Sequence, residues 1–215
     1  EKEVPPRSLH IPSRLVQTLI FTSRDFLAKI SNKPYLLINM LEAPVLAFLL
    51  AFIIRYKSAP DGSAYIFRYN ENLPAFLLMS IIVALFMGLT VSAEEIIRDR
   101  RILKRESFLN LSWNSYLLSK ISILFLLSAI QTFTFIAVGN LILEIQGMTL
   151  AFWLVLFTTS CFANVIGLNI SSAFNSAVTV YVLIPLLLIP QMILSGVLFD
   201  FDKLNDLLGT KGKVP

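Results

Sequence analysis

The chain has 215 residues, of which 56% are hydrophobic and 15% charged, and its formal net charge is only +4. A soluble domain carries about 25% charged residues, and a soluble fold of this length could not hide so much apolar surface. The composition therefore excludes an ordinary soluble domain and indicates an integral membrane protein. A single cysteine, Cys161, and a single histidine, His10, exclude an internal disulfide framework and a metal site built on these residues.

Five long apolar segments predict helices that cross a membrane. They are residues 35–54, 73–91, 121–143, 150–170 and 178–199. A helix rises about 1.5 Å per residue, so about 20 apolar residues cover a hydrocarbon core of roughly 30 Å. We therefore expect an all-α, polytopic membrane protein whose transmembrane domain covers residues 35–199.

Residues 1–34 predict a polar arm followed by an amphipathic helix. Apolar residues at helical spacing gather on one side of this helix, at Leu15, Val16, Leu19, Ile20, Phe26, Leu27 and Ile30. The other side carries Gln17, Arg24, Asp25, Ala28 and Lys29, and Phe21 does not fit the pattern. Such a helix either lies in the lipid headgroup layer or packs between the membrane part and a cytoplasmic partner.

Lys and Arg residues are divided unevenly between the two sides of this topology. Twelve fall in the N-terminal arm, the connection after the second span and the foot of the third span, and six fall on the other side. By the positive-inside rule, the N-terminus and this connection are expected to be cytoplasmic. Residues 93–115 lack Gly and Pro, so we expect helix to continue through this elbow, where Glu94 and Arg98 have the favourable i,i+4 order. The elbow is either a solvated topology signal or a rigid element that docks on another protein.

Ionisable side chains inside the predicted spans are few. Glu42 is the only acid well inside a span, and acids in membranes often mark ion paths or polar contacts. Since no second acid, His or Lys is expected at its depth, a hydrogen-bonded site is favoured over a proton relay. The sequence contains no phosphate-binding loop, paired catalytic carboxylates or nucleophile elbow. Any energy-converting module is therefore expected outside these residues, and no catalytic residue is assigned.

These features resemble the membrane domain of ABC-2 type exporters, in particular the G subfamily with the White and pleiotropic drug-resistance half-transporters. In that family an amphipathic connecting helix, with a basic residue and an Asn-Pro end, precedes the first span, and Arg24 and Asn32-Lys33-Pro34 are similar. A coupling helix with spaced acids follows the second span, and a Tyr and a Lys open the third. The matching positions here are Asp99, Glu106, Tyr116 and Lys120.

The resemblance implies partners beyond this chain. An ATP-binding cassette domain, expected in the same polypeptide, would hold ATP and magnesium, and a second copy would complete a homodimer. A sixth span would follow an extracellular re-entrant segment that begins at residues 200–215, so we expect this chain to be part of a longer protein. The expected location is a bacterial inner membrane, where the protein would move a hydrophobic or amphipathic substrate outward by alternating access. No nucleic acid partner and no cofactor within these residues are expected.

The resemblance also implies two sets of site residues. Coupling to the ATPase domain is expected at Arg24, Asp99, Arg101, Arg105 and Glu106. The second and fifth spans of two copies would face one another across a central cavity, whose wall is expected to include Phe76, Met79, Phe86, Val182 and Leu186. Two other functions stay open at this point: a membrane-embedded scaffold or sensor that recruits a cytoplasmic partner, and a secondary transporter that depends on Glu42.

Overall fold

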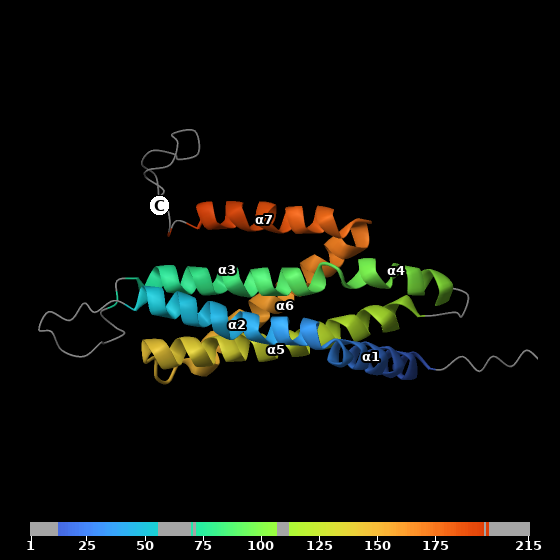
Figure 1. The fold of residues 1–215 in the computed structure, drawn as a ribbon, viewed down its shortest axis with the longest axis horizontal. Helices are drawn as coiled ribbons and strands as arrows, with labels where there is room; N and C mark the ends of the chain where they lie inside the picture. The colour runs from blue at the N-terminus through green and yellow to red at the C-terminus, as the bar shows by residue number, and fades with distance from the viewer. Residues whose placement is uncertain (1–12, 56–69, 71, 107–111, 196, 198–215) are drawn as a thin grey trace, which may run out of the picture.

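The computed structural model describes residues 13–55, 70, 72–106, 112–195 and 197, and these residues form seven α-helices and no strand (Figure 1). The helices are α1 (Arg14–Ser31), α2 (Lys33–Ile54), α3 (Leu73–Ser92), α4 (Glu95–Glu106), α5 (Trp113–Leu143), α6 (Thr149–Ala173) and α7 (Ala177–Ile193). Four of them, α2, α3, α5 and α6, are long and apolar enough to cross a membrane, and α7 is an apolar helix of 17 residues. The predicted all-α, polytopic membrane fold is confirmed.

The boundaries differ from the predicted ones at two helices. α5 begins at Trp113, well before the predicted start at residue 121, because the Ser112 side chain caps it by accepting a hydrogen bond from the backbone of Ser115. α7 ends at Ile193, whereas the prediction extended to residue 199, and residues 198 and 199 lie outside the described part of the chain.

The predicted continuous helix through the elbow is interrupted between α3 and α4. α3 ends at Ser92, and α4 starts again at Glu95 and extends beyond it (Figure 1). The start of α4 is stabilised from α6, where the Ser171 hydroxyl oxygen accepts hydrogen bonds from the backbone N–H groups of Ile96 and Ile97 at 3.1 and 3.2 Å. Since the first N–H groups of a helix have no partner within it, this contact explains why a new helix can begin here.

Small residues bring α3 and α6 into close contact. A Cβ atom added to Gly88 of α3 would lie 2.6 Å from the backbone oxygen of Ser160, and one added to Gly167 of α6 would lie 1.9 Å from the Ser92 hydroxyl. Helices in membranes commonly pack through such residues, because lipid gives little hydrophobic drive for their association. α3 is therefore held tightly against α6 in its last turns, from Gly88 to Ser92.

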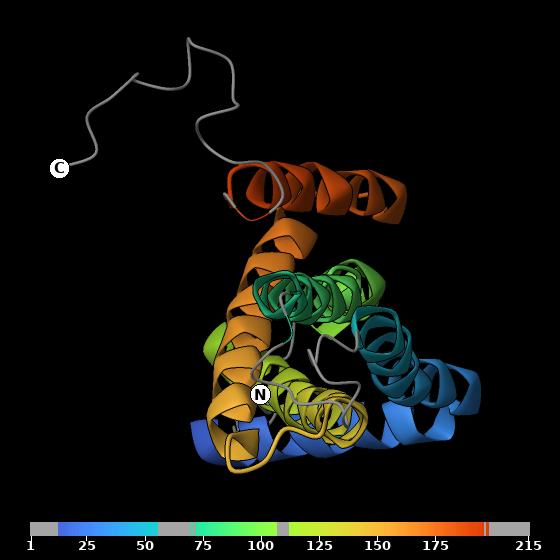
Figure 2. The same cartoon turned by 90° about the vertical axis from the view of Figure 1, so that its left-hand side faces the viewer.

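α7 lies on the outside of the bundle (Figure 2). Its buried residues Val180, Ile184 and Leu188 recur every four positions and pack on α3 and α6, where they meet Leu89 and Ala163. The opposite side of α7 is exposed, so α7 buries only one face within this chain.

α1 runs crosswise to the spanning helices at the end of the bundle that carries α4 (Figure 2). Its polar side faces the protein, since Gln17 and Lys29 are buried, whereas its apolar residues are exposed. Phe21, which did not fit the sequence pattern, is buried edge-to-face against the ring of Tyr116 at 6.0 Å between centroids. The amphipathic helix thus uses its polar side for internal packing and leaves its apolar side free for lipid.

Candidate functional site

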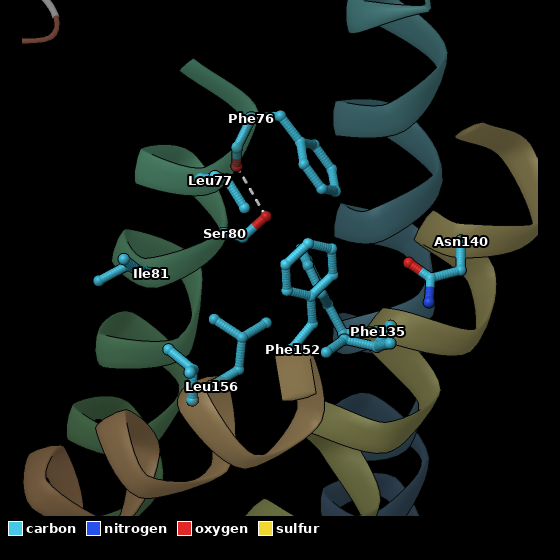
Figure 3. Close-up of a pocket in the computed structure, with 10 residues that line it drawn as sticks. Phe76, Leu77, Ser80, Ile81, Phe135, Asn140, Phe152 and Leu156 are labelled. Carbon is cyan, nitrogen blue, oxygen red and sulfur yellow. Dashed lines mark hydrogen bonds between the residues drawn. The ribbon is translucent and has the colours of Figure 1, made fainter. Parts of the chain in front are cut away.

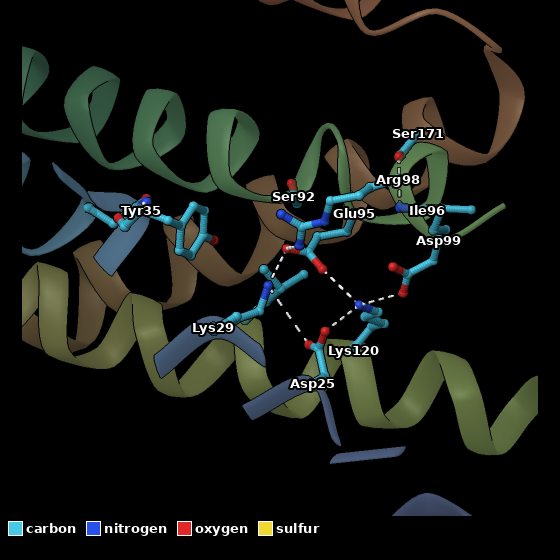
Figure 4. A network of polar contacts seen from close by, with 12 residues as sticks. Asp25, Lys29, Tyr35, Ser92, Glu95, Ile96, Arg98, Asp99, Lys120 and Ser171 are labelled. Atoms are coloured by element: carbon cyan, nitrogen blue, oxygen red, sulfur yellow. Dashed lines mark hydrogen bonds and ion pairs between the residues drawn. The ribbon is translucent and has the colours of Figure 1, made fainter. Parts of the chain in front are cut away.

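Charged side chains from three helices gather where α1 crosses the bundle (Figure 4). This group, the charge cluster, consists of three acids and three bases: Asp25, Lys29, Glu95, Arg98, Asp99 and Lys120. α1, α4 and α5 each contribute to it. Because the numbers of acids and bases are equal, the charge cluster is neutral as a whole.

Lys120 of α5 lies at its centre. Its Nζ donates hydrogen bonds to Asp25 Oδ1 at 2.6 Å and to Glu95 Oε2 at 2.9 Å, and it forms an ion pair with Asp99 Oδ2 at 2.8 Å. Three carboxylates thereby surround the ammonium group. One side chain of α5 therefore binds α1 and α4 at the same time.

Glu95, the first residue of α4, is the second centre of the charge cluster. Its carboxylate also bonds Lys29 of α1 and accepts from Arg98 at 3.1 Å. Burial by itself would raise the pKa of this carboxyl group, but the attraction of Lys120, Lys29 and Arg98 outweighs it and lowers the pKa to about 2. Glu95 is therefore ionised at neutral pH.

α4 is also fastened to the end of α6. Arg100 donates to the backbone oxygens of Ser172 and Phe174 at 2.7 and 2.9 Å and to the Asn175 side chain. The last carbonyl groups of a helix lack partners within it and carry partial negative charge, so a guanidinium is well suited to them. Together with the Ser171 contact, Arg100 fixes α4 to α6.

The contacts of the charge cluster link three helices to one another. Separating one buried charge from its partners costs several kcal/mol. α1, α4 and the first turns of α5 are therefore expected to move as one unit. Within the described residues, no three His, Cys, Asp or Glu side chains are placed to hold a metal ion.

Four of the five predicted coupling residues have described side chains, and these four divide into two groups. Asp99 belongs to the charge cluster and accepts a hydrogen bond from the Tyr116 hydroxyl at 3.1 Å. Arg101 and Arg105 are exposed on α4, and Arg24 is exposed on α1 with its guanidinium 5.3 Å from the Phe21 ring. Glu106 ends α4, and its side chain lies outside the described part of the structure.

Sequence reasoning missed much of the charge cluster. It paired Arg98 with Glu94, whereas the structure pairs Arg98 with Glu95 at i,i+3. It also placed Asp25 and Lys29 on the polar side of an amphipathic helix without assigning them a partner. One signal in the sequence was the i,i+4 spacing of Asp25 and Lys29. Both residues lie on the polar side of the amphipathic helix, and a charged side is not expected to face lipid.

The predicted cavity lies between two copies and stays a prediction, but the structure of one copy shows where its expected wall residues lie. Phe76 lines an apolar pocket of about 240 Å³ between α3, α5 and α6, with Phe135 and Phe152 (Figure 3). Phe86 lines a different apolar pocket, of about 330 Å³, between α2, α3 and α7. Met79 is partly buried in α3, and neither pocket includes it.

Val182 and Leu186 both lie on the exposed side of α7. They are one helical turn apart, opposite the buried side of α7. Together with Phe86, they place three of the predicted residues on the side of the bundle formed by α3 and α7.

Glu42 has acidic neighbours that the sequence did not reveal. It lines a third pocket together with Glu94 and Glu95. The expectation that no second acid lies near it was wrong, because Glu94 and Glu95 line the same pocket.

Comparison with known proteins agrees with this architecture. A family model described as ABC-2 type transporter matches residues 16–210, which run from the first turn of α1 past the end of α7. No curated protein and no solved structure gives a significant match to the chain. Because the family model covers most of the sequence, the chain belongs to the ABC-2 type transporter family.

Proposed function

We propose that this chain is the permease half of an ATP-driven exporter, similar to the G-subfamily half-transporters, and that it moves a hydrophobic or amphipathic substrate outward by alternating access. Membership of the ABC-2 family supports a permease component that works with an ATP-binding cassette partner. The sequence holds no nucleotide-binding loop. ATP and magnesium would therefore bind to a separate ATPase domain, which we place in the same polypeptide.

The charge cluster carries this proposal, because it gives α4 a physical connection to the membrane helices. A displacement of α4 would be transmitted to α5 through Lys120, to α1 through Lys29 and to α6 through Ser171. Arg101 and Arg105 are one turn apart and exposed on α4, where a partner can contact them. α4 therefore exposes a surface that a partner can contact and is bonded to the membrane helices on its other side. A coupling helix requires both.

The orientation follows from the charge distribution. With twelve of the eighteen Lys and Arg residues on the α1 and α4 side of the membrane, that side would be cytoplasmic. α1 would then lie in the inner headgroup layer with its apolar side in lipid. The ATPase domain would meet α4 from the cytoplasm.

A second copy would complete the transport path. α7 buries one face on α3 and α6 and exposes the other, which carries Val182 and Leu186. A homodimer whose α3 and α7 sides face each other would enclose a central cavity with apolar walls. Outward transport would follow when the closing ATPase domains move both α4 helices.

The test replaces the exposed residues of α4 in the full-length transporter. Arg101→Ala combined with Arg105→Ala should reduce ATP-driven export of a fluorescent amphipath by about tenfold, the effect of about 1.4 kcal/mol. The melting temperature should stay unchanged, since neither side chain is buried. Met148→Ala, at the opposite end of the bundle, is the control.

The possible outcomes separate the rival functions. Wild-type export in the double variant would show that α4 does not couple ATP hydrolysis to export through Arg101 and Arg105. Export that follows a proton gradient and ignores ATP would instead favour secondary transport through Glu42. A protein that recruits a cytoplasmic partner and exports nothing would be a scaffold or sensor.

A further inference from the structure

A groove between α2, α3 and α7 is polar at one end and apolar at the other. Its polar end is a pocket of about 240 Å³ beside the break between α3 and α4. The polar side chains that line it are Tyr35, Asn39, Glu42, Thr90, Glu94, Arg98 and Tyr181, besides Glu95 of the charge cluster.

The charges of this polar pocket do not cancel. Glu95 and Arg98 bond each other within the neutral charge cluster, which leaves Glu42 and Glu94 as the uncompensated acids. Glu94 interacts with the Tyr181 hydroxyl, and no cation is found bonded to Glu42 within the described residues. A carboxylate held near lipid without a cation is costly. The pocket is therefore suited to a positively charged ligand.

A further polar group in this pocket lacks a partner. The Tyr35 hydroxyl is buried and has no hydrogen-bond partner within the described residues. Asn39, which lines the same pocket, is 8% exposed, and its amide nitrogen donates to the Tyr35 backbone oxygen. Buried polar groups are nearly always satisfied in native proteins. A ligand that donates hydrogen bonds would satisfy Tyr35 together with Glu42.

The apolar pocket that Phe86 lines lies farther along the same three helices. Leu46 follows Glu42 by one turn on α2, Phe86 precedes Thr90 by one turn on α3, and Pro185 follows Tyr181 by one turn on α7. Four residues of helix rise about 6 Å, so the apolar pocket begins about one turn beyond the polar one on all three helices. Its lining, which also includes Ile184 and Leu188, offers only apolar side chains.

We propose that this groove binds a cationic amphipath, with an ammonium head beside Glu42 and Glu94 and an apolar tail along Phe86 and Leu188. The inference rests on the proposed function, since it assigns the substrate class to the α3 and α7 side of the transporter. The exposed side chains of Ile38 and Tyr181 border the polar pocket, so the head can enter sideways from the membrane leaflet on the α4 side. An anionic head is disfavoured because the guanidinium of Arg98 is already bound to Glu95.

Photolabelling of the full-length protein in lipid nanodiscs tests the proposal. Two probes share one diazirine-bearing alkyl tail, and one has a primary ammonium head and the other a sulfate head. The cationic probe should label α3 near Phe86 and α7 near Leu188 about tenfold more than the sulfate probe. A tenfold ratio corresponds to a difference in binding free energy of about 1.4 kcal/mol between the two heads. Glu42→Gln combined with Glu94→Gln should abolish the difference, and Glu42→Asp with Glu94→Asp should retain it.

Glu144→Gln, at the opposite end of the bundle, should leave the labelling ratio unchanged. Equal labelling by both probes, or an unchanged ratio in the doubly neutralised variant, would overturn the cation site. If ATP-driven export of an uncharged amphipath persists in that case, the proposed function survives without this substrate class. If the cationic probe labels the groove but ATP drives no export, the binding site stands and the proposed function fails.

Discussion

Lys120 of α5 and Glu95 of α4 form an ion pair of 2.9 Å in which each side chain is only 2% exposed. Removing two charges from water costs free energy that their attraction only partly returns, so such a pair adds little net stability by itself. The pair instead fixes the positions of its two side chains, because separating them costs free energy. The pair thereby fixes α4 relative to α5, and Lys29 and Asp25 extend the same constraint to α1.

Replacing Lys120 with Met should destabilise the protein strongly. The substitution leaves Asp25, Glu95 and Asp99 near one another without their shared cation, and breaking a buried pair from one side costs about 3–5 kcal/mol. Thermal unfolding in detergent measures the loss. Glu144→Gln is the matched control, since its partner Arg55 and Glu144 itself are exposed and such a pair contributes about 0–1 kcal/mol. Equal melting temperatures for Lys120→Met and the wild type would show that the charge cluster does not hold the helices.

Acid should weaken the charge cluster only at low pH. Glu95 has a pKa of about 2 in the folded protein against an ordinary value of 4.5. A lowered folded-state pKa contributes stability that is present above pH 4.5 and is lost as the pH falls toward 2. The contribution is at most about 3 kcal/mol.

Comparison with Glu95→Gln, which cannot titrate at this position, isolates the effect. The difference in melting temperature between the two proteins should be constant from about pH 7 to 5 and shrink from about pH 4.5 downward. A difference that already shrinks near pH 6 would mean that the carboxyl group is not held by Lys120, Lys29 and Arg98.

The sequence predicted the parts of this fold that depend on local pattern. The spans, the amphipathic α1 and the basic α4 follow from runs of apolar residues and from helical periodicity. The charge cluster depends on where three helices meet, and a single sequence does not specify which polar side of α1 faces which acid of α4. The same limit applies to Glu42, whose acidic neighbours Glu94 and Glu95 lie far from it in the sequence.

The α3–α6 interface supplies a test of helix packing. Gly88→Ala should destabilise the protein by about 1–3 kcal/mol, the usual cost of overpacking. The new Cβ would meet the Ser160 backbone oxygen at 2.6 Å and Ala163 Cβ at 2.7 Å, and backbone cannot easily yield. Gly139→Ala is the control, because its Cβ would meet only Phe76 at 3.6 Å. That variant should be neutral or gain about 0.5–1 kcal/mol from helix propensity. Similar melting temperatures for both variants would contradict the tight α3–α6 contact.

The proposed orientation can be measured with single cysteines. Cys161→Ser first removes the only native thiol. Met148→Cys, before α6, should then react with an impermeant maleimide in intact cells, and Arg101→Cys on α4 should react only after the membrane is opened. Both native side chains are exposed, so access through protein does not limit either reaction. The reverse labelling pattern would place α4 outside the cell and remove the basis for coupling to a cytoplasmic ATPase.

The two faces of α7 predict how two copies meet. Val178, Val182 and Leu186 recur every four residues on the exposed face, whereas Ile184 is 2% exposed against α3 and α6. In a homodimer whose α7 helices face each other, Val182→Cys in the Cys161→Ser background should form an oxidative crosslink between copies, since a disulfide requires Cα atoms within about 7 Å. Ile184→Cys should form none, because its side chain points into its own copy. Gel electrophoresis without reductant detects the crosslink. If cysteines at Val178, Val182 and Leu186 all fail to crosslink while a dimer persists in detergent, the copies meet through another surface and the central cavity is not formed by α7.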